Sequence, residues 1–298
     1  MISPPLPLEE LRQRIDHIDD RIHDLLMERA EVVKQIGVAK GGGYGMLRPA
    51  REATILRRLA ARHHGELAVG VLLRMWRELI SGLTQLQGRF TVAVYAPGDH
   101  HGFWDLARDH FGGFTPMSIV NSPLAAVRAV AEGTAMVGVV PLPADDDIDP
   151  WWRFINGDDE RTPHVVARLP FAGRSNYRSE DRDAFVIALV PHEPSATGPA
   201  SFQNDRSLLR IEVSGDLSRG RLKDALEAVG LPPTSFCSWL GRGGGAATLH
   251  LVEIAGFVGT GDPRLAVFVE RLLPLSARLN AMGGYAVPLS HVLDGQQP

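Results

Sequence analysis

Arg29 occupies a position where the surrounding sequence otherwise places apolar residues. Ile15, Ile22 and Ile36 are separated by seven residues or by a multiple of seven, and Arg29 fills the missing place in that series. This spacing puts the four side chains along one stripe of a helix. A cation in an apolar stripe is costly unless an anion meets it, so Arg29 indicates a site that binds an anion.

Two further basic residues can contribute to such a site. Lys40 lies 11 residues after Arg29 and points in nearly the same direction, because successive helical residues turn by about 100°. Arg12 lies 17 residues before Arg29 and points about 100° away from it. We therefore expect Arg12 to reach a shared site more easily from a neighbouring chain.

The next two predicted helices carry polar residues that suit the same site. The segment RPARE places Arg48, Arg51 and Glu52 near the start of one helix, and Ser81 and Gln85 share a face of the other because they are four residues apart. A single such residue is commonly explained by an ion pair across a helix bundle. The combination, with Glu52 as the main acidic partner of the basic cluster, instead predicts a pocket for one small dianion.

The first 88 residues must supply the helices that position this pocket. We expect helices over residues 8–40, 50–63 and 67–87. The glycine-rich run 41–45 ends the first helix, and Pro49 suits the first turn of the second. The apolar stripe of the first helix is close to a heptad repeat, which predicts a long antiparallel or dimeric partner.

Strands and helices alternate after residue 88, which predicts a parallel α/β sheet. Residues 190–205 are rich in proline and polar residues and are interpreted as a linker. From Arg206 onward the predicted order is βαββαβ, the ferredoxin-like arrangement, with its second helix over residues 263–280. The predicted domains are 1–88, 89–198 and 199–298.

Composition narrows the class of protein. Net charge is −4, which excludes the basic excess of a nucleic-acid-binding protein, and the lone Cys237 excludes a disulfide framework or a cysteine-rich zinc site. No apolar run approaches the length of a membrane span, and the first residues lack the apolar stretch of a signal peptide. We expect a soluble, cytoplasmic protein with no nucleic acid, membrane or metal partner.

The helical region resembles the all-helical chorismate mutases over about 80 residues. The resemblance is carried by the segments LRQRID, ERAEVVKQIGVAK, RPARE and SGLTQ. It implies an intertwined dimer in which the long first helix lends Arg12 to the pocket of the partner chain. It also implies an isomerase (an intramolecular transferase) that needs no cofactor, because chorismate rearranges to prephenate by a concerted shift.

The resemblance implies a role for each residue of the predicted pocket. Arg12 and Arg29 would clamp carboxylates, Lys40 and Gln85 would donate to the ether oxygen, and Glu52 would accept from the ring hydroxyl. Arg51 and Ser81 would bind or orient the carboxylate side. Some members carry aspartate where this chain has Arg48, so the hydroxyl contact is expected to rest on Glu52 alone, with Arg48 as a further substrate-binding residue.

The remainder of the chain resembles the bifunctional chorismate mutase–prephenate dehydratases. The tail segments MGGYAVP and VEIAG are similar to those of the ACT domains, which implies pairing with a second copy and a possible aromatic amino acid effector, with Gly220 and Leu222 near its site. The middle region lacks the Glu-Asn-Ser motif, and Asp183, Ala184 and Phe185 replace the Thr-Arg-Phe motif. It is also too short for two lobes, so we expect a dehydratase-like remnant without dehydratase activity.

The favoured function is therefore a chorismate mutase of phenylalanine and tyrosine biosynthesis. Three alternatives remain: a bifunctional mutase–dehydratase, an isochorismate-pyruvate lyase with the same helical fold, and a non-catalytic protein that senses aromatic amino acids.

Overall fold

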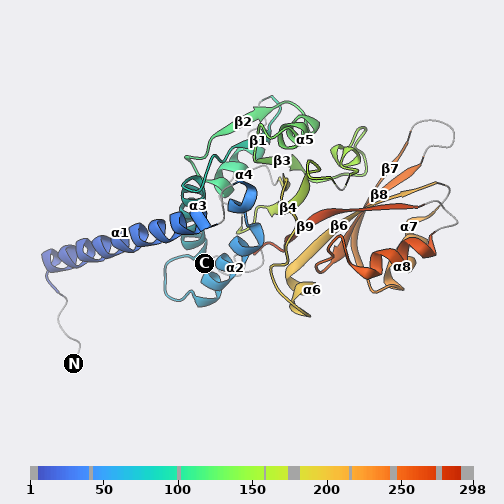
Figure 1. Ribbon diagram of the computed structural model, residues 1–298. Helices are drawn as coiled ribbons and strands as arrows, with labels where there is room; N and C mark the ends of the chain where they lie inside the picture. The colour runs from blue at the N-terminus through green and yellow to red at the C-terminus, as the bar shows by residue number, and fades with distance from the viewer. Residues whose placement is uncertain are drawn as a thin grey trace.

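The computed structural model describes residues 6–39, 43–98, 102–157, 159–173, 182–214, 217–241, 247–272 and 277–289. The chain begins with helices and continues into one mixed sheet with helices on its faces (Figure 1). The helical elements are α1 (Leu8–Ala39), the short 3-10 helix η1 (Gly43–Met46), α2 (Pro49–Arg62) and α3 (Val69–Gln85). The three predicted helices are confirmed to within two residues at each end.

Helix α1 projects away from the rest of the chain (Figure 1). None of its 32 residues is buried, although it carries the apolar stripe noted above. The Ile15 side chain is 58% exposed and that of Ile22 is 46% exposed. Gly37, near the end of α1, lies beside the side chain of Gln87, which follows α3.

Helices α2 and α3 pack against each other and against later parts of the chain. Leu56 of α2 and Leu73 of α3 are fully buried in one cluster. Phe171 and Ala286, which come from the α/β region and from the last strand, belong to the same cluster. The helical region therefore shares its core with the rest of the chain.

The middle region is one α/β lobe with a helix on each face of its sheet. Phe103 of α4 packs on one face, and Val127 of α5 packs on the other. Ser122 accepts a hydrogen bond from the Ala125 amide (3.1 Å) and so caps α5 at its start. The elements are β1 (Val92–Tyr95), α4 (Gly102–Phe111), β2 (Met117–Val120), α5 (Pro123–Ala131), β3 (Val137–Pro141), the 3-10 helix η2 (Trp151–Phe154), β4 (His164–Leu169) and β5 (Ala184–Ala188).

The prediction of a parallel sheet was only partly correct. Strands β1, β2 and β3 are parallel, but β5 runs antiparallel to both β3 and β4. Strands β4 and β5 follow each other without a crossover helix among the described residues, and such a connection reverses the chain direction.

The C-terminal region has the predicted βαββαβ order. Its strands lie in the order β9-β6-β8-β7, and all neighbouring pairs are antiparallel. Its elements are β6 (Asp205–Val213), α7 (Arg219–Glu227), β7 (Pro233–Leu240), β8 (Thr248–Ala255), α8 (Pro263–Arg271) and β9 (Arg278–Ala286).

Two predicted boundaries were wrong. The helix expected over residues 263–280 ends at Arg271, and residues 278–280 already belong to β9. The predicted linker 190–205 contains the short helix α6 (Ala200–Asn204) and the first residue of β6.

The two halves of the sheet join at Gly283, and the next residue, Gly284, packs closely on β6. Strand β4 meets β9 at a single register pair, Val165 with Gly283, which makes one nine-stranded sheet in the order β2-β1-β3-β5-β4-β9-β6-β8-β7. Gly283 has φ +94°, and a Cβ there would lie 2.3 Å from the Val165 carbonyl oxygen. A Cβ on Gly284 would lie 2.1 Å from the Arg206 carbonyl oxygen, so both positions require glycine. Among the described residues, no helix is long and apolar enough to cross a lipid bilayer.

Candidate functional site

Two predicted site residues of α1, Arg12 and Arg29, lie in different surroundings. Arg12 lies in the first turns of α1, is exposed and forms a loose ion pair with Glu9 (Nη1 to Oε2, 3.6 Å). Arg29 is half-buried, and its Nη1 atom is buried with no hydrogen-bond partner in the described part of the chain. Burial lowers the pKa of the Arg29 guanidinium. Lys40 lies outside the described residues.

Glu52 forms an ion pair with a residue that the sequence analysis did not select. Its Oε2 atom accepts a hydrogen bond from Nη1 of Arg77 at 2.7 Å, and this pair joins α2 to α3. The side chains are 15% and 6% exposed, respectively. The expectation that Glu52 mainly balances the predicted cationic cluster was therefore wrong for the described residues, because its partner is Arg77.

The polar face of α3 contacts the C-terminal end of α4. Nε and Nη2 of Arg77 both donate to the His110 carbonyl oxygen, at 2.9 and 2.7 Å, and the buried Ser81 hydroxyl donates to the same oxygen at 3.4 Å. Gln85 donates through Nε2 to the hydroxyl of Thr115 at 3.2 Å. Carbonyl groups in the last turn of a helix lack intrahelical donors, so a guanidinium stabilises this end of α4.

These contacts bring three predicted site residues together. Glu52, Ser81 and Gln85 all line the boundary between α2, α3 and α4, with Arg77 between them. His110 is half-buried at this boundary, and burial together with the nearby Arg77 charge lowers the pKa of its imidazole well below the usual value. Its ring is therefore neutral near pH 7.

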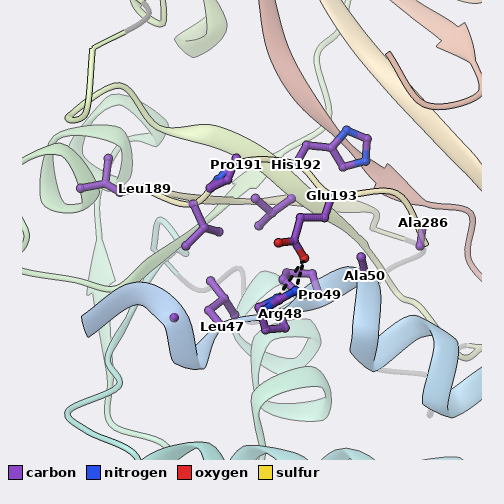
Figure 2. A pocket seen from close by; sticks show the side chains of 12 residues that line it. Leu47, Arg48, Pro49, Ala50, Leu189, Pro191, His192, Glu193 and Ala286 are labelled. Carbon is purple, nitrogen blue, oxygen red and sulfur yellow. Dashed lines mark hydrogen bonds and ion pairs between the residues drawn. The ribbon is translucent and has the colours of Figure 1, made fainter. Parts of the chain in front are cut away.

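Arg48 and Arg51 lie at the start of α2 and are both exposed. Arg48 binds Oε2 of Glu193 through Nε (2.9 Å) and Nη2 (2.8 Å). Figure 2 shows this pair at a cavity of about 230 Å³ between α2, the segment after β5, and Ala286 of β9. Arg48 is thus paired toward the C-terminal half of the chain rather than toward Ser81 and Gln85.

His192 borders the same cavity (Figure 2). Both ring nitrogens are buried and have no hydrogen-bond partner in the described part of the chain. The ring lies over Gly284, where a Cβ would come within 2.5 Å of it, and 5.0 Å from the ring of Phe257. Burial, assisted by the charge of His164, lowers the pKa of His192 to about 4.

The three residues that stand in place of the dehydratase motif make contacts within the fold. Asp183 accepts a hydrogen bond from Nη2 of Arg168 at 2.7 Å, and Ala184 and Phe185 are buried in β5. Burial opposes the charge on Arg168, but hydrogen bonds to Asp183 and Tyr285 dominate and raise its pKa.

The part of the tail predicted to lie near an effector also contacts other residues of the chain. Leu222 is buried in the core of the tail, and Gly220 lies beside it in the first turn of α7. The neighbouring Arg219 donates to both carboxylate oxygens of Asp145, which comes from the loop after β3. Ser238 lies within hydrogen-bond distance of His250 Nδ1 at 2.8 Å. No group of three potential metal ligands occurs in the described ranges.

Arg77 is the site residue that sequence reasoning missed. It lies four residues before Ser81 and eight before Gln85, so all three fall on one face of α3. This spacing could have identified it. Its partner His110 could not have been identified, because the packing of α4 on that face is not visible in the sequence.

Comparison with known proteins finds similarity over part of the chain. Residues 11–88 match the family described as chorismate mutase type II. A bifunctional chorismate mutase/prephenate dehydratase of Stutzerimonas stutzeri is 32% identical over 147 residues, which are 45% of this chain and 38% of that protein. The chain therefore spans less than two fifths of that relative in the match.

Two solved structures show only a distant likeness. A structure described as GqqA, a novel type of quorum quenching acylase, is 17% identical with a TM-score of 0.47, covering 70% of this chain and 98% of that one. Prephenate dehydratase from Streptococcus mutans is 12% identical with a TM-score of 0.45, covering 67% and 98%. At these scores neither structure identifies the fold. Residues 11–88, which span most of α1 and all of α2 and α3, are the part of the chain that matches the chorismate mutase type II family.

Proposed function

We propose that this chain is an isomerase that rearranges chorismate to prephenate. The observation that carries the proposal is Arg29, whose buried Nη1 atom has no partner among the described residues, within a segment that matches the chorismate mutase family. A carboxylate of a small dianionic substrate would supply the missing acceptor.

The proposed mechanism relies on positioning and charge. Arg29 and a partner-chain Arg12 hold the substrate carboxylates, and this selects the compact conformer in which the new bond can form. Lys40 and Gln85 donate to the ether oxygen as negative charge develops on it. Glu52 accepts a hydrogen bond from the ring hydroxyl while Arg77 holds its carboxylate in place. Arg51 and Ser81 complete the substrate-binding set, and Arg48 joins it only on release from Glu193.

We infer that the active form is a homodimer. Helix α1 buries none of its residues in the single chain, and a second α1 would cover its apolar stripe. Arg12 is exposed and lies 17 residues before Arg29, which agrees with its use by a partner chain. The dimer therefore completes the pocket and covers the helix at the same time.

Substitution of Lys40 tests this mechanism. Lys40→Ala removes one pre-organised donor, and we expect kcat to fall about 10²- to 10³-fold. Lys34→Ala is the matched control, because Lys34 is an exposed lysine of α1. A folded Lys40→Ala protein with the rate of the Lys34→Ala protein would refute the assignment.

We propose no dehydratase activity for residues 89–198. Asp183 is already paired with Arg168, and the segment between β3 and β4 has only the short helix η2 among its described residues.

We propose that residues 199–298 form an ACT-like domain whose effector is an aromatic amino acid. We also propose that the enzyme works in the cytoplasm. The βαββαβ order and the antiparallel strand order support the ACT-like assignment.

A further inference from the structure

Helix α2 is bound on two faces by different parts of the chain. Glu52 faces α3, where it binds Arg77. Arg57 is five residues later and points about 140° away from Glu52 on the helix. Its guanidinium contacts residues that lie more than 130 positions further along the chain.

Arg57 makes three short hydrogen bonds to the C-terminal half. Nη1 donates to the hydroxyl of Ser195 at 2.7 Å, and Nη2 donates to the carbonyl oxygens of Asn204 (2.8 Å) and Val287 (2.7 Å). The Thr54 hydroxyl, one turn earlier on α2, lies 3.2 Å from the Ser195 carbonyl oxygen and 2.9 Å from the Ala50 carbonyl oxygen of its own helix. These bonds join α2 to the segment before β6 and to the residue after β9.

The acceptor side of this junction is itself fixed. Asp205 is fully buried, and its carboxylate accepts hydrogen bonds from the Ser195 amide, at 3.2 Å to each oxygen, and from the Ser195 hydroxyl. The Ser195 hydroxyl thus accepts from Arg57 and donates to Asp205. A chain of charge-assisted bonds runs from α2 to the first residue of β6.

We propose that Arg57 is a positioning residue for the mutase pocket, which sets α2, and with it Glu52, through its bonds to the C-terminal half of the chain. The inference rests on the proposed mutase function. Arg57 itself touches no substrate, and its effect passes through the placement of α2. A small misplacement of reacting groups is enough to cost a large factor in rate.

A comparison of neighbouring arginines tests the proposal. Arg57→Ala is expected to lower kcat/KM for chorismate at least about tenfold, mostly through kcat, while Arg58→Ala stays within about twofold. Arg58 is exposed on the same helix and serves as the control. Arg57→Lys keeps the charge but not the forked geometry, so it should restore part of the loss.

A double variant separates positioning from a general loss of stability. If Arg57 acts through Glu52, then Arg57→Ala added to Glu52→Gln should reduce the residual rate by less than about threefold. The same tenfold loss in both backgrounds would overturn the proposal, as would wild-type kinetics in a folded Arg57→Ala protein. If Arg57→Ala does not fold, the Ser195→Ala variant takes its place in the same comparison, because it removes one of the three acceptors of Arg57.

Hydrogen exchange gives a readout independent of activity. Amides of residues 50–62 should exchange faster in Arg57→Ala, while those of α4 keep their protection. Unchanged protection of α2 would overturn the positioning role. A wild-type protein that does not convert chorismate would refute the proposed function, and the mutase role of Arg57 with it, even if the exchange result shows that Arg57 holds α2.

Discussion

Arg77 Nη1 and Glu52 Oε2 lie 2.7 Å apart in an ion pair that connects α3 to α2, and both side chains are largely buried. Arg77 also donates twice to the carbonyl oxygen of His110 at the end of α4. One guanidinium therefore connects three helices, and one of its acceptors is the carboxylate proposed to receive the substrate hydroxyl.

Loss of Arg77 should destabilise the chain strongly. Arg77→Met leaves the Glu52 carboxylate buried without its partner, and removal of one member of a buried pair costs about 3–5 kcal/mol. Arg74→Met is the control, because its pair with Asp109 is more exposed and an exposed pair is worth less than about 1 kcal/mol. Urea unfolding measures the free energy of unfolding of both variants. Equal losses of that free energy in the two variants would contradict the structural role of Arg77.

Mixed dimers should show whether Arg12 serves the partner chain. Arg12→Ala and Lys40→Ala proteins are each expected to be nearly inactive. In a heterodimer of the two, one pocket receives intact Arg12 and intact Lys40, while the other pocket lacks both. After random exchange of subunits, about a quarter of wild-type activity should return, because half of the dimers are mixed and each has one intact pocket. No recovery after verified exchange would place Arg12 in the pocket of its own chain.

Gly283 should be intolerant of any side chain. Gly283→Ala forces a Cβ into the Val165 carbonyl oxygen and strains a positive φ, so we expect a loss of more than about 2 kcal/mol in the free energy of unfolding. Gly82→Ala is the control, since its Cβ would meet nothing within 4 Å and alanine favours a helix by about 1 kcal/mol. A Gly283→Ala protein as stable as the wild type would refute the tight junction between β4 and β9.

His192 should make the protein less stable at mildly acidic pH. Its folded pKa is about 4 against an ordinary value of 6.5, so the unfolded chain binds the proton more readily. With respect to His192, the protein therefore keeps its full free energy of unfolding above pH 6.5. As the pH falls toward 4, protonation of His192 in the unfolded chain lowers that free energy by about 3 kcal/mol at most. His192→Phe should flatten the decrease in Tm over this range. The decrease should not vanish, because burial also lowers the pKa of His110 and His250. An unchanged pH profile would contradict burial of a neutral His192.

The sequence predicted most elements because their signals are local. The spacing of apolar residues in α1, the proline at the start of α2 and the β-branched runs of β3 to β5 each specify one element. Helix α8 was predicted too long because the leucines from Leu272 to Leu279 fit a helical spacing, although residues 278 onward form a strand. Pro274 is a local signal for a helix end that outweighs this spacing.

Contacts between distant segments could not be predicted. The ion pair of Arg48 with Glu193 and the hydrogen bonds of Arg57 to Ser195 depend on how α2 lies against the C-terminal half. The antiparallel direction of β5 depends on which strands become neighbours. The face shared by Ser81 and Gln85 was predicted correctly, whereas its packing on α4 was not visible without the fold.

The most direct test of the central claim is to identify the products when the purified chain is incubated separately with chorismate, isochorismate and prephenate. The account predicts that chorismate is converted to prephenate and that no phenylpyruvate forms from prephenate. Phenylpyruvate would contradict the proposed loss of dehydratase activity, and pyruvate released from isochorismate would favour the lyase. If none of the three substrates is consumed, the chain is not a chorismate mutase.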